Sequence, residues 1–327
     1  MMRLLQNTNI PFVGVRKIAY VISAILILAG LIGLFARGLN WSIDFTSGVA
    51  TKVNLLALDS NVAPIQIDEL RSVLMNNGYP EAEIQHVGAE ESSTFMIKLK
   101  SQQADDEVSA DTKTRIIEII RENFPEHVKG RDINTQVILE IYEVGPKVGG
   151  ELRTQSLLAV CIALVLMIAY IWFRFELTFG LMAIVALAHD VIIIVGIFAL
   201  TGKEISVQII AALLTIVGYS INDTIVIFDR IREDLKAKRK EPLAQVINIS
   251  INQTLSRTII TSGTTLITAL ALYFFGGAVL NDFAFAIVLG VIFGTYSSIF
   301  IASNLVIDFT KATHKEKQTA QHLSKRK

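Results

Sequence analysis

Hydrophobic and polar residues are segregated along the chain into long blocks. The first apolar run covers residues 18–36. Five further runs return in the second half of the sequence, at about 155–173, 176–200, 206–228, 258–276 and 283–307. Roughly 20 apolar residues in a helix cross the hydrocarbon core of a bilayer, so the pattern predicts six transmembrane helices. No small-residue cleavage motif follows the first run, and we expect it to remain as an uncleaved anchor.

The region between the first two runs, residues 38–151, has the periodicity of a folded domain. Phe95, Ile97 and Leu99 alternate with polar neighbours as in a half-buried strand. Two helical patterns and three further strands complete the order β-α-β-β-α-β, which is the ferredoxin-like split βαβ arrangement. The predicted fold class is an α-helical polytopic membrane protein of six transmembrane helices, with one α+β ferredoxin-like domain between helices 1 and 2.

The composition agrees with a membrane protein and argues against a soluble enzyme. Hydrophobic residues make up 52% of the 327 residues and charged residues 18%, whereas a soluble domain has roughly 25% charged residues. Cys161 is the single cysteine, the five histidines lack metal-ligand spacing, and there is no glycine-rich phosphate loop. We therefore expect no catalytic residue, no metal, no cofactor and no nucleic-acid partner.

The positions of Lys and Arg predict the orientation in the membrane. Basic residues concentrate in segments 1–17, 229–257 and 308–327, whereas the alternate short connections contain only Lys203. Connections rich in Lys and Arg stay in the cytoplasm. The sequence predicts a cytoplasmic N-terminus, a basic cytoplasmic loop at 229–257, a basic cytoplasmic tail and a domain at 38–151 outside the membrane.

The stretch 215–234 contains the strongest candidate site. Asn222 and Asp223 lie inside its apolar part, and an alternation of acids and bases begins at Asp229. An ionisable side chain inside a membrane is costly and rare, so it predicts a functional site. The alternative is that Asp223 lies near enough to the end of the span to be wetted by lipid headgroups.

Polar residues gather on one face of the fourth predicted helix and form a stripe on the fifth. On the fourth, Thr215, Tyr219, Asn222 and Asp223 share a face with Val226. The stripe on the fifth consists of Arg257, Thr261, Thr264, Thr265 and Thr268. Lipid offers such a stripe no partner, so we expect it to face the bundle interior. Both Asp223 and Arg257 fall in the cytoplasmic half of the membrane, which allows contact. Alternatively, the threonines only bond to the preceding helical turn and Arg257 extends to the headgroups.

Two other features of the spans are open to a functional or a structural interpretation. His189 and Asp190 lie near the middle of the third span, where a packed or hydrogen-bonded histidine is more common than a metal ligand. Gly290 and Gly294 form a GxxxG pattern, which favours close helix packing.

A buried acid near a mobile cation predicts an ion relay. If a conformational change moves Arg257 away from Asp223, the acid takes up a proton, and their approach expels it. Opening the site to each side in turn would carry one ion across per cycle, and the membrane potential supplies about 2.3 kcal/mol per charge per 100 mV. The predicted relay pair is Asp223 and Arg257.

Several long motifs resemble one known family. They are WSIDFTSG at 41–48, VGPKVGGEL at 144–152, AHD at 188–190, GYSINDTIVIFDRIRED at 218–234, SRTIITSGTT at 256–265 and FFGG at 274–277. Together they cover nearly the whole chain and resemble the SecF family, the membrane subunits of the bacterial SecDF protein-export complex. This family usually reads DFTGG where the chain has Ser47, which leaves the loop geometry there open because serine does not adopt a left-handed conformation cheaply.

The resemblance implies half of a twelve-span bundle similar to RND transporters, in the bacterial inner membrane, with the outer domain in the periplasm. It implies SecD as an obligate hetero-partner, and the SecYEG channel, YajC and YidC as further partners, together with the translocating preprotein and membrane lipid. It implies that Asp223 and Arg257 correspond to the family's intramembrane acid and arginine. The implied function is use of the H⁺ or Na⁺ gradient to assist late preprotein translocation.

Two alternatives of other classes remain at the level of sequence. A half-transporter of the RND type would export a small hydrophobic molecule or lipid, but such exporters usually carry two large outer subdomains per half and a phenylalanine-rich pocket. A purely structural scaffold would need neither Asp223 nor Arg257.

Overall fold

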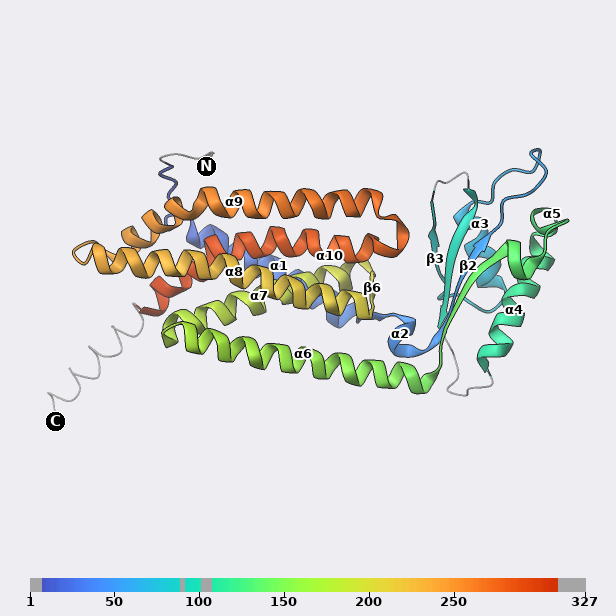
Figure 1. Cartoon of the computed structure of the whole chain (residues 1–327), viewed down its shortest axis with the longest axis horizontal. Coiled ribbons are helices and arrows are strands. Elements are labelled where there is room, and N and C mark those ends of the chain that lie inside the picture. Colours follow the sequence, from blue (N-terminus) through green and yellow to red (C-terminus); the bar gives the residue numbers. More distant parts are fainter. Residues whose placement is uncertain (1–7, 89–91, 101–107, 311–327) are drawn as a thin grey trace.

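The computed structural model describes residues 8–88, 92–100 and 108–310. It is elongated, with a bundle of long helices at one end and a small α+β domain at the other (Figure 1). Most of the predicted basic tail, from residue 311 onward, lies outside the described residues.

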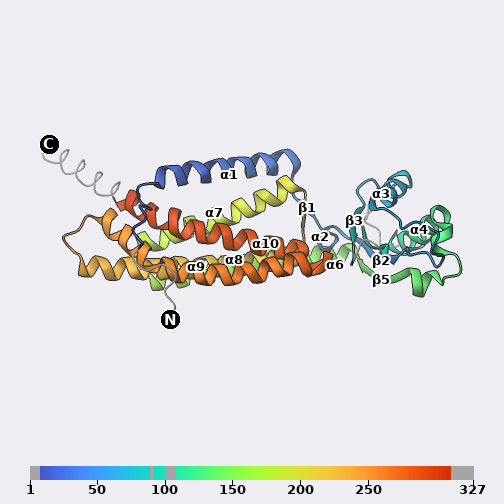
Figure 2. The same cartoon turned by 90° about the horizontal axis from the view of Figure 1, so that it is seen from above.

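Six helices of the described chain are long and apolar enough to span a membrane, which confirms the predicted number. They are α1 (Arg16–Arg37), α6 (Pro146–Arg174), α7 (Leu177–Thr201), α8 (Val207–Ala237), α9 (Leu243–Phe275) and α10 (Gly277–Tyr296), the last continuing through the π-helical segment η3 (Ser297–Ala302). Helix α1 lies along α7 at the edge of the bundle (Figure 2). Close approach of these two helices requires glycine, because a Cβ atom on Gly196 would lie 2.5 Å from the Cα of Gly30.

Segment 229–257 is helical almost throughout, and differs in this from the predicted loop. Helices α8 and α9 extend past the apolar runs and leave only residues 238–242 between them. Their charged ends are amphipathic: Ile231 and Ile247 are fully buried, and Ser250 donates a hydrogen bond of 2.8 Å to Asp234. Charge alone favours a loop, whereas packing between the two ends stabilises a helical structure.

The α+β domain has the predicted ferredoxin-like topology. Its elements are β2 (Gly48–Asn54), α3 (Ile67–Asn76), β3 (Glu83–His86), β4 (Thr94–Lys100), α4 (Val108–Asn123) and β5 (Ile138–Val144), with short helices α5 (Pro125–Val128) and η2 (Ile133–Val137) before β5. The strand order is β3-β4-β2-β5 and all neighbours are antiparallel.

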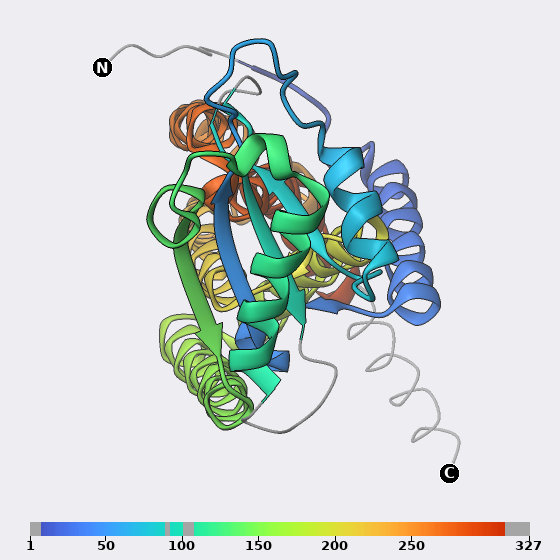
Figure 3. The same ribbon diagram turned by 90° about the vertical axis from the view of Figure 1, so that its right-hand side faces the viewer.

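The two faces of this sheet have different environments. Helices α3 and α4 cover the face turned away from the bundle (Figure 3). On that face, Phe95, Ile97 and Leu99 are buried with Leu70 and other apolar residues in one core. The opposite face carries the alternating polar residues and is turned toward the bundle. The strand periodicity therefore also determines which side chains face the bundle.

Short elements connect the domain to the bundle. After α1, strand β1 (Asn40–Trp41) pairs in parallel with β6 (Glu204–Ile205), which lies between α7 and α8. Helix α2 (Ile43–Thr46) follows and packs against the start of α6. The segments before and after the domain therefore both meet the bundle at the same end.

Ser47 adopts a backbone conformation with positive φ, which is unfavourable for serine. Its φ is 69° and its ψ 156°, a region occupied almost only by glycine. The next residue, Gly48, has φ 150°, and a Cβ atom there would lie 2.2 Å from the carbonyl oxygen of Leu99. The turn into β2 thus uses glycine where backbone approach requires it and holds a strained serine beside it.

Candidate functional site

Asp223 is buried in the interior of the helical bundle. It lies on α8 and is 3% exposed, and the Oγ of Ser262 on α9 donates a hydrogen bond of 3.2 Å to its Oδ2. Ser262 in turn accepts a hydrogen bond of 2.7 Å from Thr295 on α10. The carboxyl group therefore lies where α8, α9 and α10 meet, in the interior of this chain's bundle.

Ser262 is a site residue that the sequence analysis missed. It falls between the threonines of the predicted stripe, on the side of α9 that packs against α8 and α10. A serine in an apolar run next to a glycine gives a weak signal. Only the packing of the three helices decides that this hydroxyl, rather than a threonine, meets Asp223.

Arg257 lies on the exposed side of α9. Among the described residues, no ion pair within 4.0 Å joins it to Asp223, although it is near enough to act on that carboxyl electrostatically. The structure thus captures an arrangement in which the two groups of the predicted relay are separated and a neutral hydroxyl is the closer partner of the acid.

Within this chain the threonine stripe is only partly covered. Thr261, Thr264, Thr265 and Thr268 each donate a hydrogen bond to the carbonyl four residues earlier on α9. Thr264 and Thr268 are exposed, as are Thr215 and Asn222 on α8. The reason is that α9 lies at the edge of the bundle with only α8 and α10 as major neighbours.

Tyr219 lies beside this exposed face. Its side chain is partly buried, and its hydroxyl group has no hydrogen-bond partner among the described residues. A buried hydroxyl without a partner is uncommon. Tyr219 is therefore an unsatisfied polar group on α8 within the described residues.

Asp190 is the centre of a second, fully satisfied polar cluster. It is 1% exposed and accepts hydrogen bonds from Ser220 at 2.6 Å and from Ser297 at 2.8 Å. Its Oδ1 lies 2.9 Å from the Nδ1 of His189. These contacts bring together α7, α8 and η3.

His189 extends this cluster to the first helix. Its Nε2 lies 2.9 Å from the Oγ of Ser23 on α1, and its ring stacks on Tyr296. Both ring nitrogens are thus occupied by hydrogen bonds, in agreement with the expected packed histidine. Within the described residues, no group of three or more His, Cys, Asp or Glu side chains is arranged to hold a metal ion.

The π-helical segment η3 contacts both polar clusters. Ser297 donates to Asp190, whereas Ser298 lies 2.8 Å from Thr224 on α8, next to Asp223. Thr295, which bonds to Ser262, precedes the segment by two residues. π-Helical turns occur frequently at functional sites, and this one connects the surroundings of the two buried acids.

Comparison with known proteins identifies the family. Residues 126–312 match the family described as "Protein export membrane protein SecD/SecF, C-terminal", and residues 32–49 match the "SecD/SecF GG Motif". The protein translocase subunit SecF of Desulfurispirillum indicum is 46% identical over 301 residues, which are 91% of each chain. The protein translocase subunit SecDF of Thermus thermophilus is 45% identical over 94% of this chain and 39% of its own.

Solved structures give the same result. The crystal structure of SecDF from Thermus thermophilus has a TM-score of 0.77 and 40% sequence identity, and the match covers 95% of this chain and 40% of that one. A crystal structure of SecDF in the super-membrane-facing form has a TM-score of 0.66 at 40% identity, over 98% and 41% of the two chains. The chain thus spans about two fifths of these SecDF chains, and by its sequence, its six spans and its α+β domain it belongs to the SecF family of protein translocase subunits.

Proposed function

We propose that this subunit of the Sec protein-export machinery uses a transmembrane gradient of H⁺ or Na⁺ to assist late preprotein translocation. Asp223 binds and releases the ion, and Arg257 controls its occupancy. The α+β domain holds or moves the preprotein. Membership of a translocase family favours this function over export of a small hydrophobic molecule.

The burial of Asp223 carries this proposal. A carboxyl group in a membrane interior persists only where it is used or paired, and among the described residues its one hydrogen-bond partner is the neutral hydroxyl of Ser262. A pure scaffold has no need for this arrangement. Arg257 is exposed on α9, the helix that carries Ser262, and is free to approach or leave Asp223 as the bundle changes conformation.

The cycle follows from the charge of the acid. With Arg257 distant, Asp223 binds an ion from one side of the membrane. Approach of the guanidinium group provides the carboxylate with an opposite charge and displaces the ion toward the other side. The helices that carry the two groups, α8 and α9, are connected to the domain end of the bundle, so their relative motion transmits force to the domain.

SecD is the proposed partner. The exposed side of α6 is apolar, with Leu164, Val165 and Trp172 on it, and suits lipid. The exposed side of α8 and α9 instead presents Asn222 and Arg257 together with the threonines. Polar groups at membrane depth need a protein or water-lined surface. A second half-bundle over this face, as in relatives that carry SecD and SecF in one chain, supplies it, and SecYEG, YajC and YidC are proposed as further partners.

The proposed orientation places both termini and the junction of α8 and α9 in the cytoplasm. That junction holds Lys238, Arg239 and Lys240, next to Lys236, whereas the opposite end of the bundle carries the α+β domain. The excess of basic residues at one end supports this orientation. The domain is then periplasmic and meets the preprotein as it leaves the channel.

The ion is identified by flux measurements on vesicles. The chain is reconstituted with SecD, and uptake is followed under an imposed H⁺ or Na⁺ gradient, with Asp223→Asn as the test and Asp229→Asn, on the same helix, as the matched control. The proposal expects flux of one ion in the wild type and in the control and none in Asp223→Asn. Equal flux in all three proteins would contradict it.

A further inference from the structure

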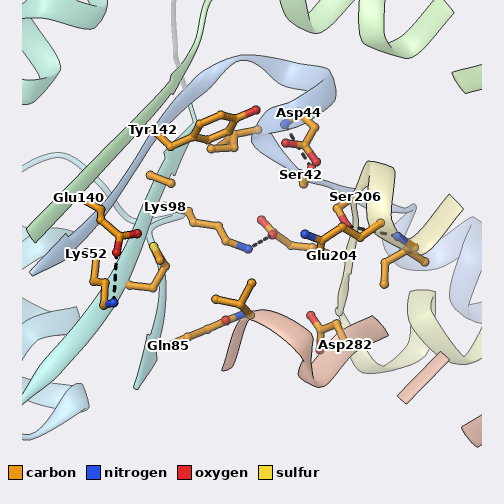
Figure 4. Close-up of a pocket in the computed structure, with 16 residues that line it drawn as sticks. Ser42, Asp44, Lys52, Gln85, Lys98, Glu140, Tyr142, Glu204, Ser206 and Asp282 are labelled. Carbon is orange, nitrogen blue, oxygen red and sulfur yellow. Dashed lines mark hydrogen bonds and ion pairs between the residues drawn. The ribbon is translucent and has the colours of Figure 1, made fainter. Parts of the chain in front are cut away.

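A cavity of about 290 Å³ lies between the sheet and the bundle. The bundle-facing residues of the strands, among them Gln85 and Lys98, line one side of it. Glu204 of β6, Ser206 and Asp282 of α10 line the other (Figure 4). The cavity is therefore the place where the domain and the membrane part meet, and its charged side chains determine how firmly they meet.

Lys98 forms the main ionic contact across this junction. Its Nζ lies 2.5 Å from the Oε2 of Glu204, and the side chain of Glu204 is only 3% exposed. The two side chains point toward each other across the cavity (Figure 4). A buried carboxylate paired with one lysine fixes the domain to the connection between α7 and α8.

A second carboxyl group competes for the same lysine. Glu83 on β3 faces Lys98 and Glu204, and its Oε2 is buried without a hydrogen-bond partner among the described residues. The Oε1 of Glu204 is likewise buried without a hydrogen-bond partner among the described residues. One ammonium group can neutralise one of the two carboxylates. Oxygens of two ionised carboxylates can only accept hydrogen bonds. One proton placed between the two carboxyl groups would give both of these oxygens a partner.

The other charged groups around the cavity are already paired or lie elsewhere. Lys203, next to β6, lies 2.5 Å from Asp282 of α10, and Lys52 of β2 is 3.3 Å from Glu140 of β5. Lys100 of β4 donates to Asn40, and Asp44 of α2 accepts from the backbone of Val207. No second cation among these described groups remains for the Glu83–Glu204 pair.

We propose that Glu83 and Glu204 share one proton and, with Lys98, form a proton-binding site whose occupancy holds the α+β domain against the membrane bundle. The site joins two elements that are not otherwise hydrogen-bonded, β3 and β6. It needs neither Asp223 nor Arg257, so it extends the proposed function without depending on it. Its ligand is the proton itself, taken from the aqueous side on which the domain lies.

The electrostatics of the pair agree with proton binding near neutral pH. Burial, and next the hydrogen bond that Glu83 forms with Glu204 once it is protonated, raise the pKa of Glu83 from 4.5 to about 8, against the opposing effect of Lys98. Burial lowers the pKa of Lys98, but the carboxylates of Glu83 and Glu204 raise it by more, so the net shift is upward and Lys98 stays charged. The site then holds one cation, one carboxylate and one neutral carboxyl group.

The linkage gives the direction of the pH effect. The docked form of Glu83 binds a proton with a pKa of about 8, whereas a solvated Glu83 has the ordinary value of 4.5. Docking is therefore strongest below pH 4.5, and it weakens as the pH rises from 4.5 toward about 8. For one proton, the docking constant falls up to about tenfold per pH unit within this window.

Infrared difference spectra of the full chain with SecD, recorded through a pH titration, test the proton. The wild type should show a protonated carboxyl band lost with a midpoint near pH 8. The band should be missing in Glu83→Gln and in Glu204→Gln, and present in the control Glu143→Gln on the exposed side of β5. A band that titrates alike in all four proteins, or no such band in the wild type, would overturn the site.

Spin labels test the docking. The labels are placed at Met75 of α3 and Thr201 of α7, on a background with Cys161→Ser, and the distance distribution is measured at pH 6 and pH 9. We expect one narrow distance at pH 6 and a longer second population at pH 9, absent in Glu83→Gln, which keeps a neutral side chain. An unchanged wild-type distribution at pH 9, or the same response in Glu83→Gln, would overturn the role in docking.

Discussion

Ser262 on α9 donates a 3.2 Å hydrogen bond to Asp223 on α8, the proposed ion carrier. The bond crosses between two helices inside the bundle and is supported by Thr295 on a third. A neutral hydroxyl in this position can accompany either charge state of the acid. The hydroxyl group of Ser262 therefore positions Asp223, and the proposed role of Arg257 is to change the charge state of Asp223.

Replacing this hydroxyl should weaken the site without abolishing it. Ser262→Ala removes the partner of Asp223 and is expected to lower stability by about 0.5–1.5 kcal/mol, as for other hydrogen bonds between membrane helices. Ion-driven translocation should fall but remain measurable, and Ser262→Thr should restore it. Thermal unfolding and vesicle translocation measure the two effects.

Thr261→Val is the matched control for that substitution. Thr261 is the preceding residue, and among the described residues its hydroxyl bonds only to carbonyls of its own helix. It should leave translocation unchanged. If Thr261→Val and Ser262→Ala reduced activity equally, the special role of Ser262 would be wrong.

Gly290 should be required for the packing of α10 on α8. A Cβ atom there would lie 2.3 Å from the side chain of Ile216, whereas one on Gly263 of α9 would have no neighbour within 4 Å. We expect Gly290→Ala to destabilise the protein by about 1–3 kcal/mol through overpacking. Gly263→Ala should be neutral or stabilising by up to about 1 kcal/mol because alanine favours helix. Thermal unfolding that gave the two variants the same stability would contradict the close approach.

Ser47 should be a site of stored backbone strain. Ser47→Gly is expected to raise the free energy of unfolding by about 1 kcal/mol, within the 1–3 kcal/mol typical of such a conformation. Ser42→Gly is the control, because Ser42 has an extended conformation and caps α2 through Asp44. It should lose a few tenths of a kcal/mol instead. A loss of stability in Ser47→Gly would show that its hydroxyl group matters more than the strain.

The cluster around Asp190 should be structural. In Asp190→Asn an amide nitrogen replaces one acceptor oxygen, where Ser220 and Ser297 donate to the carboxyl group and the ring of His189 lies at hydrogen-bond distance. We expect a loss of about 1–3 kcal/mol, the cost of an unsatisfied buried polar group. Thermal unfolding measures it. A variant with unchanged stability that had lost ion-coupled activity would instead assign Asp190 to the relay.

Periodicity was sufficient to predict the six spans and the order of elements in the α+β domain. Long apolar runs have few alternatives to membrane helices, and alternation in β4 defines both the buried and the polar face of the sheet. The same pattern, however, treated the ends of α8 and α9 as a loop. Their buried residues, such as Ile231 and Ile247, are spaced among charges that dominate the composition.

The site was predicted only in part, because tertiary packing decides which polar groups meet. Asp223 was visible as a charge in an apolar run. Ser262 was not, because the threonine stripe gave a stronger pattern on a face of α9 that this chain leaves exposed. Glu83, Lys98 and Glu204 lie in three separate elements, and each read as an ordinary polar position until the fold placed them around one cavity.

In the proposed function, Asp223 couples the ion gradient to preprotein translocation. The most direct measurement is the rate of late preprotein translocation into vesicles containing SecYEG, SecD and the chain, with and without an imposed ion gradient. We expect the gradient to accelerate translocation in the wild type and in Asp229→Asn, and to have no effect in Asp223→Asn. Equal acceleration in Asp223→Asn would contradict it.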